Sequence, residues 1–260
     1  MSDTTFEIKP ISFALKGAEP PVEEGSIAAS LTTQFAALSS AIDAAARTQA
    51  VNNAGFASLL EVTGDFLALM HTLDRQYGAN AAFPLADVGD AADDALRTTA
   101  ELESWLSRLN LAHERTHLFN VQLGIAYWAM QHGLAFETVA PVVNALAEQA
   151  NAAETRQETA AVFAMMQGFV QHLAPGLQAD LERSNPERPW RLLNLNFAIT
   201  AIRTGDAAMM RYAFDRLNEH LPDERAGFYR EAHALACQPG FPTETWALIE
   251  AEYTRWTRPH

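Results

Sequence analysis

Cysteine is almost absent from this sequence of 260 residues, with Cys237 as its single example. One thiol cannot close an internal disulfide, and without a Cys-x-x-Cys pair the sequence has no zinc ribbon or dithiol redox motif. Cys237 follows the apolar residues Ala234-Leu-Ala, so we expect it to be buried and inert. The cysteine content therefore excludes a disulfide-stabilised fold.

Positive charge is also scarce, because lysine occurs only as Lys9 and Lys16 and the formal net charge is −14. Phosphate backbones and anionic lipids repel an acidic chain, so we expect neither nucleic acid nor membrane as a partner. Residues 1–180 hold 8 basic and 21 acidic side chains, whereas residues 181–260 hold 10 and 11. This uneven charge distribution has two interpretations. The chain has two surfaces that bind different partners, or its alanine-rich bundle has one solvated acidic face.

Long apolar runs are missing as well. The most apolar stretch, Leu118–Met130, is interrupted by polar residues and a glycine, and it is shorter than the roughly 18 apolar residues that suggest a membrane-spanning helix. Met1–Pro10 has no basic segment followed by an apolar one, so we expect no secretory signal. Alanine richness, with arginine in place of lysine, is typical of a GC-rich bacterial genome. These features predict a cytoplasmic bacterial protein.

What the sequence does contain is helical periodicity, which begins at Ser26 and predicts an all-α fold. Residues 1–25 are expected to form a short irregular N-terminal arm and linker, because Pro10 interrupts the β-forming residues and residues 17–25 are rich in Gly, Pro and Glu. Residues 26–110 contain three apolar stripes of about 20 residues each, which favours a bundle of long antiparallel helices.

The helices expected in residues 111–260 are shorter and are separated by Gly and Pro turns, a pattern typical of stacked helical hairpins. We treat residues 26–260 as a single all-helical domain. Around the turn Gly205-Asp206, residues 190–222 resemble a tetratricopeptide repeat. The matching positions are Phe197, Ala198, Phe214 and Pro222, and the departures are Asn194 and Met210. This resemblance implies a helical scaffold that presents a groove to a protein or peptide.

The sharpest chemical motif is His113-Glu-Arg-Thr-His117, which has the HExxH pattern. On one helix the two imidazoles could bind Zn²⁺, with Glu114 as the catalytic base. The motif resembles that of the gluzincin metalloproteases, and Glu137 lies at a spacing compatible with the third ligand of that family. One point weighs against this interpretation: those enzymes need a sheet before the active-site helix, whereas residues 26–110 predict only helices. Glu114-x-x-His117 also fits half of a di-iron site, but the sequence has no second copy.

Four aspartates gather where the third helix is expected to begin: Asp87, Asp90, Asp93 and Asp94. Their spacing is similar to the Mg²⁺-binding motifs of all-helical isoprenoid synthases. The sequence lacks the second acidic motif and the basic residues that those enzymes need. Capping and stabilisation of the helix dipole is therefore the favoured interpretation.

Trp190 lies between Arg188 and Arg191 at an expected helix start. An aromatic side chain flanked by arginines suits an interaction anchor, although a core position is the more common role of tryptophan. No complete catalytic set is present. The sequence thus favours a non-catalytic scaffold that needs no cofactor, binds a protein or peptide and is able to form a homo-oligomer. The alternatives are a metal-dependent enzyme built on the HExxH motif and a small-molecule-binding helical bundle around residues 118–130.

Overall fold

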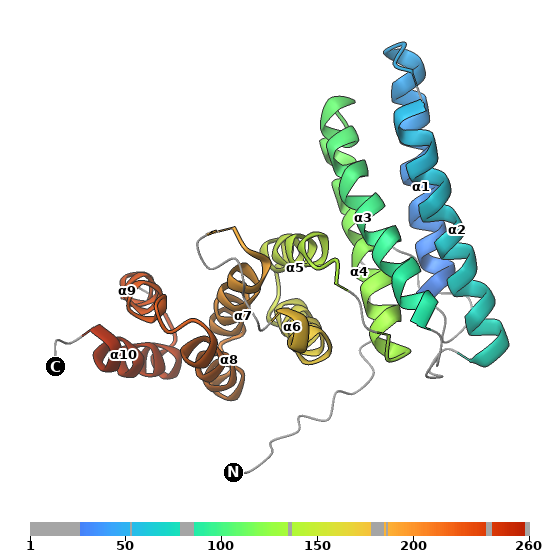
Figure 1. Ribbon diagram of the computed structural model, residues 1–260. Helices are drawn as coiled ribbons and strands as arrows, with labels where there is room; N and C mark the ends of the chain where they lie inside the picture. Colours follow the sequence, from blue (N-terminus) through green and yellow to red (C-terminus); the bar gives the residue numbers. More distant parts are fainter. Residues whose placement is uncertain are drawn as a thin grey trace. The chain divides into compact units, whose positions relative to one another are not determined.

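The computed structural model describes residues 27–52, 54–78, 86–134, 137–177, 185, 187–237 and 241–257. Among these residues the elements are ten α-helices and one 3₁₀ turn, with no strand, which confirms the predicted all-α fold (Figure 1). The predicted N-terminal arm, residues 1–25, lies outside the described residues.

The contacts of the chain divide it into two compact units. We call the first the bundle unit; it comprises the described residues up to Ala145 together with Gly168–Leu173. We call the second the hairpin unit; it comprises Leu146–Gln167 together with the described residues from Ala174 onward.

Four long helices build the bundle unit. They are α1 (Ile27–Thr48), α2 (Ala54–Tyr77), α3 (Ala86–Arg108) and α4 (Arg115–Gln131). Helix α1 packs against α2 and α4, and α3 packs against the same two helices, so the four helices close a ring. The apolar stripe of α1 lies in the core, with Leu31, Leu38 and Ile42 fully buried. This is the packing expected of a four-helix bundle with short connections.

Helix α4 differs from its prediction, which placed residues 112–132 in the hairpin part of the chain. Buried residues lie on all sides of α4. Its backbone also lies close to α1, because a Cβ atom added at Gly124 would lie 2.2 Å from Leu31 Cδ2. Glycine at this position therefore lets α4 approach α1 closely. The bundle has four helices instead of three because α4 supplies the fourth wall of its core.

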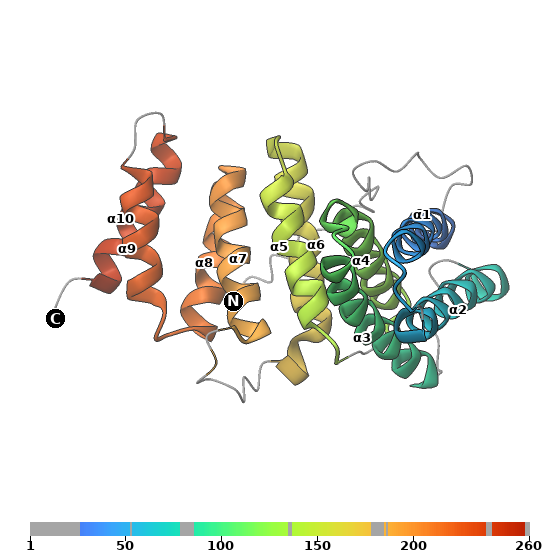
Figure 2. The same ribbon diagram turned by 90° about the horizontal axis from the view of Figure 1, so that it is seen from above.

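The remaining helices form hairpins (Figure 2). They are α5 (Ala140–Ala152), α6 (Arg156–Leu177), α7 (Pro189–Thr204), α8 (Ala207–His220), α9 (Arg225–Ala236) and α10 (Thr243–Thr257). Helix α7 packs against α8, and α10 packs against α9 and α8. The predicted turn between α7 and α8 is confirmed: Gly205 has φ +67°, and the Asp206 carboxylate accepts the Ala208 and Met209 N–H groups at 2.8 and 2.9 Å.

A polar network connects three helices of the hairpin unit. The amide of Asn218 on α8 accepts the hydroxyl of Tyr229 on α9 and donates to the carboxylate of Glu252 on α10. Glu252 also accepts the indole N–H of Trp256 at 2.7 Å. Burial raises the pKa of Tyr229, which keeps its hydroxyl neutral as a donor. The network fixes how α9 and α10 meet α8.

Candidate functional site

The HExxH motif does not lie on one helix. His113 and Glu114 belong to the 3₁₀ turn η1 (Ala112–Glu114), and α4 begins only at Arg115. The Glu114 carboxylate lies between the two imidazoles, with Oε1 at 3.4 Å from His113 Nε2 and Oε2 at 3.7 Å from His117 Nε2. The side chain of His113 is 70% exposed. The turn places Glu114 as an ion-pair partner of both histidines.

His117 is oriented by the interior of the bundle. Its Nδ1 lies 2.6 Å from Oε1 of Gln34 on α1, and the same oxygen accepts the Asn120 side-chain N–H at 3.3 Å. Because this oxygen can only accept, Nδ1 of His117 is the donor and Nε2 is left facing Glu114. Gln34 and Asn120 are both buried. This arrangement gives His117 a structural role between α1 and α4.

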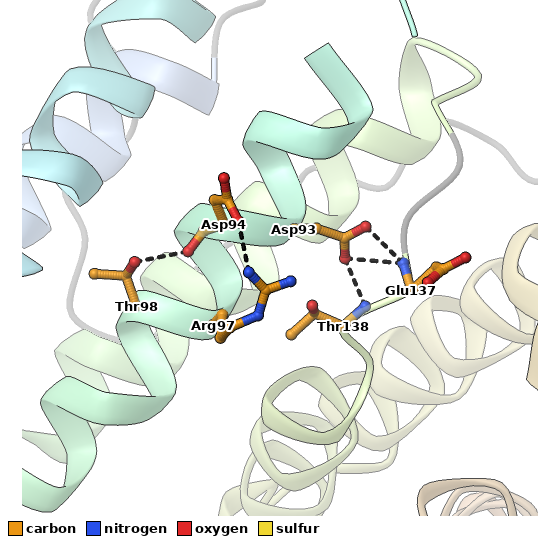
Figure 3. Close-up of polar contacts among 6 residues, drawn as sticks. All are labelled: Asp93, Asp94, Arg97, Thr98, Glu137 and Thr138. Carbon is orange, nitrogen blue, oxygen red and sulfur yellow. Dashed lines mark hydrogen bonds and ion pairs between the residues drawn. The ribbon is translucent and has the colours of Figure 1, made fainter. Parts of the chain in front are cut away.

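Glu137 is not brought to the two histidines. It follows α4 in the chain, whereas His113 precedes it, and the 17 residues of α4 correspond to a length of about 25 Å. Figure 3 shows where Glu137 is held instead: its backbone N–H donates to both carboxylate oxygens of Asp93 on α3, each at 2.8 Å. In the described part of the chain, no three His, Cys, Asp or Glu side chains are grouped closely enough to hold a metal ion. The alternative zinc set therefore lacks the geometry that it needs.

Asp93 acts as a cap, although not for its own helix. Besides Glu137 it accepts the Thr138 backbone N–H at 2.5 Å, just before α5 begins. Asp94 points elsewhere and pairs with Arg97 at 2.6 Å on the exposed face of α3 (Figure 3). The predicted capping of the third helix start is therefore wrong for Asp93, because its carboxylate accepts from a segment that lies 44 residues further along the chain.

Replacing Asp93 by alanine is expected to lower the free energy of unfolding by about 1–2 kcal/mol, because two backbone N–H groups lose a charged acceptor. Urea denaturation measures this change. Asp94→Ala is the matched control, since both groups of its ion pair are more than half exposed and such pairs contribute less than about 1 kcal/mol. Equal losses in the two variants would show that Asp93 does not hold this segment.

The predicted binding residues at the start of α7 are engaged within the hairpin unit. Trp190 is only 2% exposed and makes an edge contact with the ring of His220. Arg191 donates Nε and Nη2 to the two carboxylate oxygens of Glu224, at 2.6 and 3.2 Å, and this lowers the Glu224 pKa. Arg188 is 9% exposed and donates to the Asn185 carbonyl. Arg191 therefore fastens α7 to the segment before α9, and the Trp190 ring is buried within the hairpin unit.

The outward face of α7 was not predicted from the sequence. Four aliphatic residues on this face lie within an arc of about 80° on the helix. We call them the α7 stripe: Leu192, Leu195, Ile199 and Ile202. Ile199 is 46% exposed and the other three are half-buried. The opposite face of α7 carries the fully buried Leu193 and Phe197. The helix is therefore apolar on both sides, and only one side faces the core.

Two arginine contacts border the α7 stripe. On one side Arg191 pairs with Glu224, which immediately precedes α9. On the other side Arg203 donates to the carbonyls of Ala150 and Ala153 at the end of α5. Both contacts lie within the hairpin unit and fix the rotation of α7 about its axis. They hold the stripe on the outward side of the helix.

A buried polar cluster in the bundle unit was also not predicted from the sequence. Oδ1 of Asp74 accepts the Trp128 indole N–H at 2.7 Å and lies 3.1 Å from His132 Nε2. The side chain of Asp74 is 5% exposed and that of His132 is fully buried. No local residue spacing predicts this cluster, because Asp74 is on α2, 54 residues before Trp128.

The prediction that Cys237 is buried is wrong, because this residue is exposed. It caps the C-terminal end of α9, where its side chain lies beside that of His233.

Comparison of the chain with protein families, curated proteins and solved structures found no match. Among the described residues, none of the helices combines the length and the apolar character needed to cross a membrane.

Proposed function

We propose that the hairpin unit is a non-catalytic binding module and that the α7 stripe is its contact surface for a protein partner. The observation that supports this most directly is the second apolar face of α7, with Ile199 46% exposed at its centre. Contiguous apolar surface on a soluble domain commonly marks an interaction site.

The shape of the stripe suggests the chemistry of the partner. Leu192 to Ile202 spans about 15 Å, or three helical turns. An amphipathic helix that carries apolar side chains three and four residues apart would match this surface along its length. The rigid contacts of Arg191 and Arg203 at its borders keep the surface in place before a partner arrives, which lowers the entropic cost of binding.

The test uses peptides selected from a random displayed library on the full chain, with affinity measured by fluorescence anisotropy. Ile199→Asp is expected to weaken the selected peptides at least about tenfold, because burying one such side chain is worth about 1.5–3 kcal/mol. Val62→Asp on α2 is the matched control, since Val62 is 43% exposed and also aliphatic. We expect this variant to bind like the wild type. If it loses as much affinity as Ile199→Asp, or if Ile199→Asp loses none, the α7 stripe is not the contact surface.

A further inference from the structure

Three reactive side chains of the last hairpin come together outside the α7 stripe. The sulfur of Cys237 lies 3.8 Å from Nε2 and 3.9 Å from Nδ1 of His233. Nε2 of the same imidazole lies 2.5 Å from Oε2 of Glu250 on α10. A thiol, an imidazole and a carboxylate in this order form the kind of arrangement that activates a sulfur nucleophile.

The imidazole in this cluster is held in a fixed position. Its ring stacks flat on Tyr253 of α10, with centroids 4.2 Å apart and planes 11° apart. The His233 imidazole has two electrostatic partners in this place. One is the carboxylate of Glu250, and the other is the negative end of the α9 dipole, because His233 lies in the last turn of that helix.

The geometry determines how His233 can act on the thiol. Because the sulfur is almost equally distant from both ring nitrogens, it lies beside the ring instead of in line with one N–H bond. A positive charge on the ring therefore stabilises a thiolate through space, without a directed hydrogen bond. Cys237 is also exposed, so a reagent can reach the sulfur.

We propose that Cys237 is a reversible modification site that undergoes exchange with disulfides, and that His233 is a positioning residue that stabilises its thiolate. The thiol first loses its proton to water. The thiolate then attacks one sulfur of a disulfide RSSR, so that a bond forms between Cys237 and that sulfur while the original S–S bond breaks. The second sulfur leaves as RS⁻ with the electron pair and takes up a proton. Cys237 is oxidised, the reagent is reduced, and a further thiol reverses the step.

The test is simple because the chain has a single cysteine, so every thiol signal belongs to Cys237. The rate of reaction with dipyridyl disulfide is measured on the full chain across neutral and mildly acidic pH. His233→Phe keeps a ring on Tyr253 but removes the two ring nitrogens, and we expect it to react about tenfold more slowly at neutral pH. We also expect the difference from the wild type to shrink at alkaline pH, where any thiol ionises.

A second comparison needs no variant and stands if His233→Phe fails to fold. The wild type unfolded in urea exposes the same thiol without the cluster. The folded protein is expected to react faster than the unfolded one at neutral pH. A folded protein that reacts more slowly, or a folded His233→Phe variant with the wild-type rate and pH profile, would overturn the proposal.

Discussion

Replacing Asp74 by alanine is expected to lower the free energy of unfolding of the bundle unit by about 3–5 kcal/mol, the largest loss that we expect for a single residue there. The reason is the position of this carboxylate. Its Oδ1 accepts the Trp128 indole N–H at 2.7 Å and lies 3.1 Å from His132 Nε2, and all three side chains are buried. Alanine leaves the indole and the imidazole in the core without this acceptor.

Urea denaturation of the full chain, followed by far-ultraviolet circular dichroism, measures the loss. Asp65→Ala is the matched control, because Asp65 lies on the same helix and is exposed; we expect it to change stability by less than about 0.5 kcal/mol. Asp74→Asn keeps one oxygen acceptor and replaces the other oxygen by an NH₂ group, so its loss should fall between the other two. If Asp74→Ala is as stable as Asp65→Ala, the cluster does not stabilise the bundle.

Replacing Phe197 by alanine is expected to cost the hairpin unit about 3–5 kcal/mol. Phe197 is fully buried on the inward face of α7. Its ring stacks on that of Phe163 of α6, with centroids 4.4 Å apart, and contacts the edge of Tyr212 on α8. One ring therefore joins three helices, and its removal leaves a cavity between them.

The control for Phe197→Ala is Ile199→Ala, two residues further along the same helix but on its outward face. We expect that variant to lose less than about 1 kcal/mol, because Ile199 is 46% exposed. Amide exchange of α7 and α8 reports on the hairpin unit directly. Similar amide exchange in the two variants would contradict the distinction between an inward face of α7 that stabilises the hairpin unit and an outward face that does not.

Periodicity and turn chemistry in the sequence were enough to predict most of the helices and the α7–α8 turn, because both depend on local residues. The position of α4 could not be predicted in this way. A helix that is buried all round has no polar face, so its sequence does not tell which helices surround it. The α7 stripe could not be predicted for a similar reason, because the sequence does not show whether an apolar residue of a helix faces the core or the solvent.

For the candidate sites, too, the local sequence pattern was visible, but the contacts with distant parts of the chain were not. The HExxH spacing is correct, but the motif assumes a continuous helix, whereas η1 ends at Glu114 and α4 starts at Arg115. Cys237 follows apolar residues but lies at the end of α9, where the side chain meets solvent. The partner of His233, Glu250, comes from another helix and is visible only in three dimensions.

Isoleucine methyl NMR of the full chain, titrated with a selected peptide, tests the central proposal most directly. Ile199 and Ile202 on α7 serve as the reporters of the stripe, and the fully buried Ile42 and Ile125 of the bundle unit serve as internal controls. We predict that the two α7 methyl signals shift in proportion to bound peptide while those of Ile42 and Ile125 stay in place. Shifts at Ile42 or Ile125 with unchanged α7 signals would contradict the proposal and would place binding in the bundle unit.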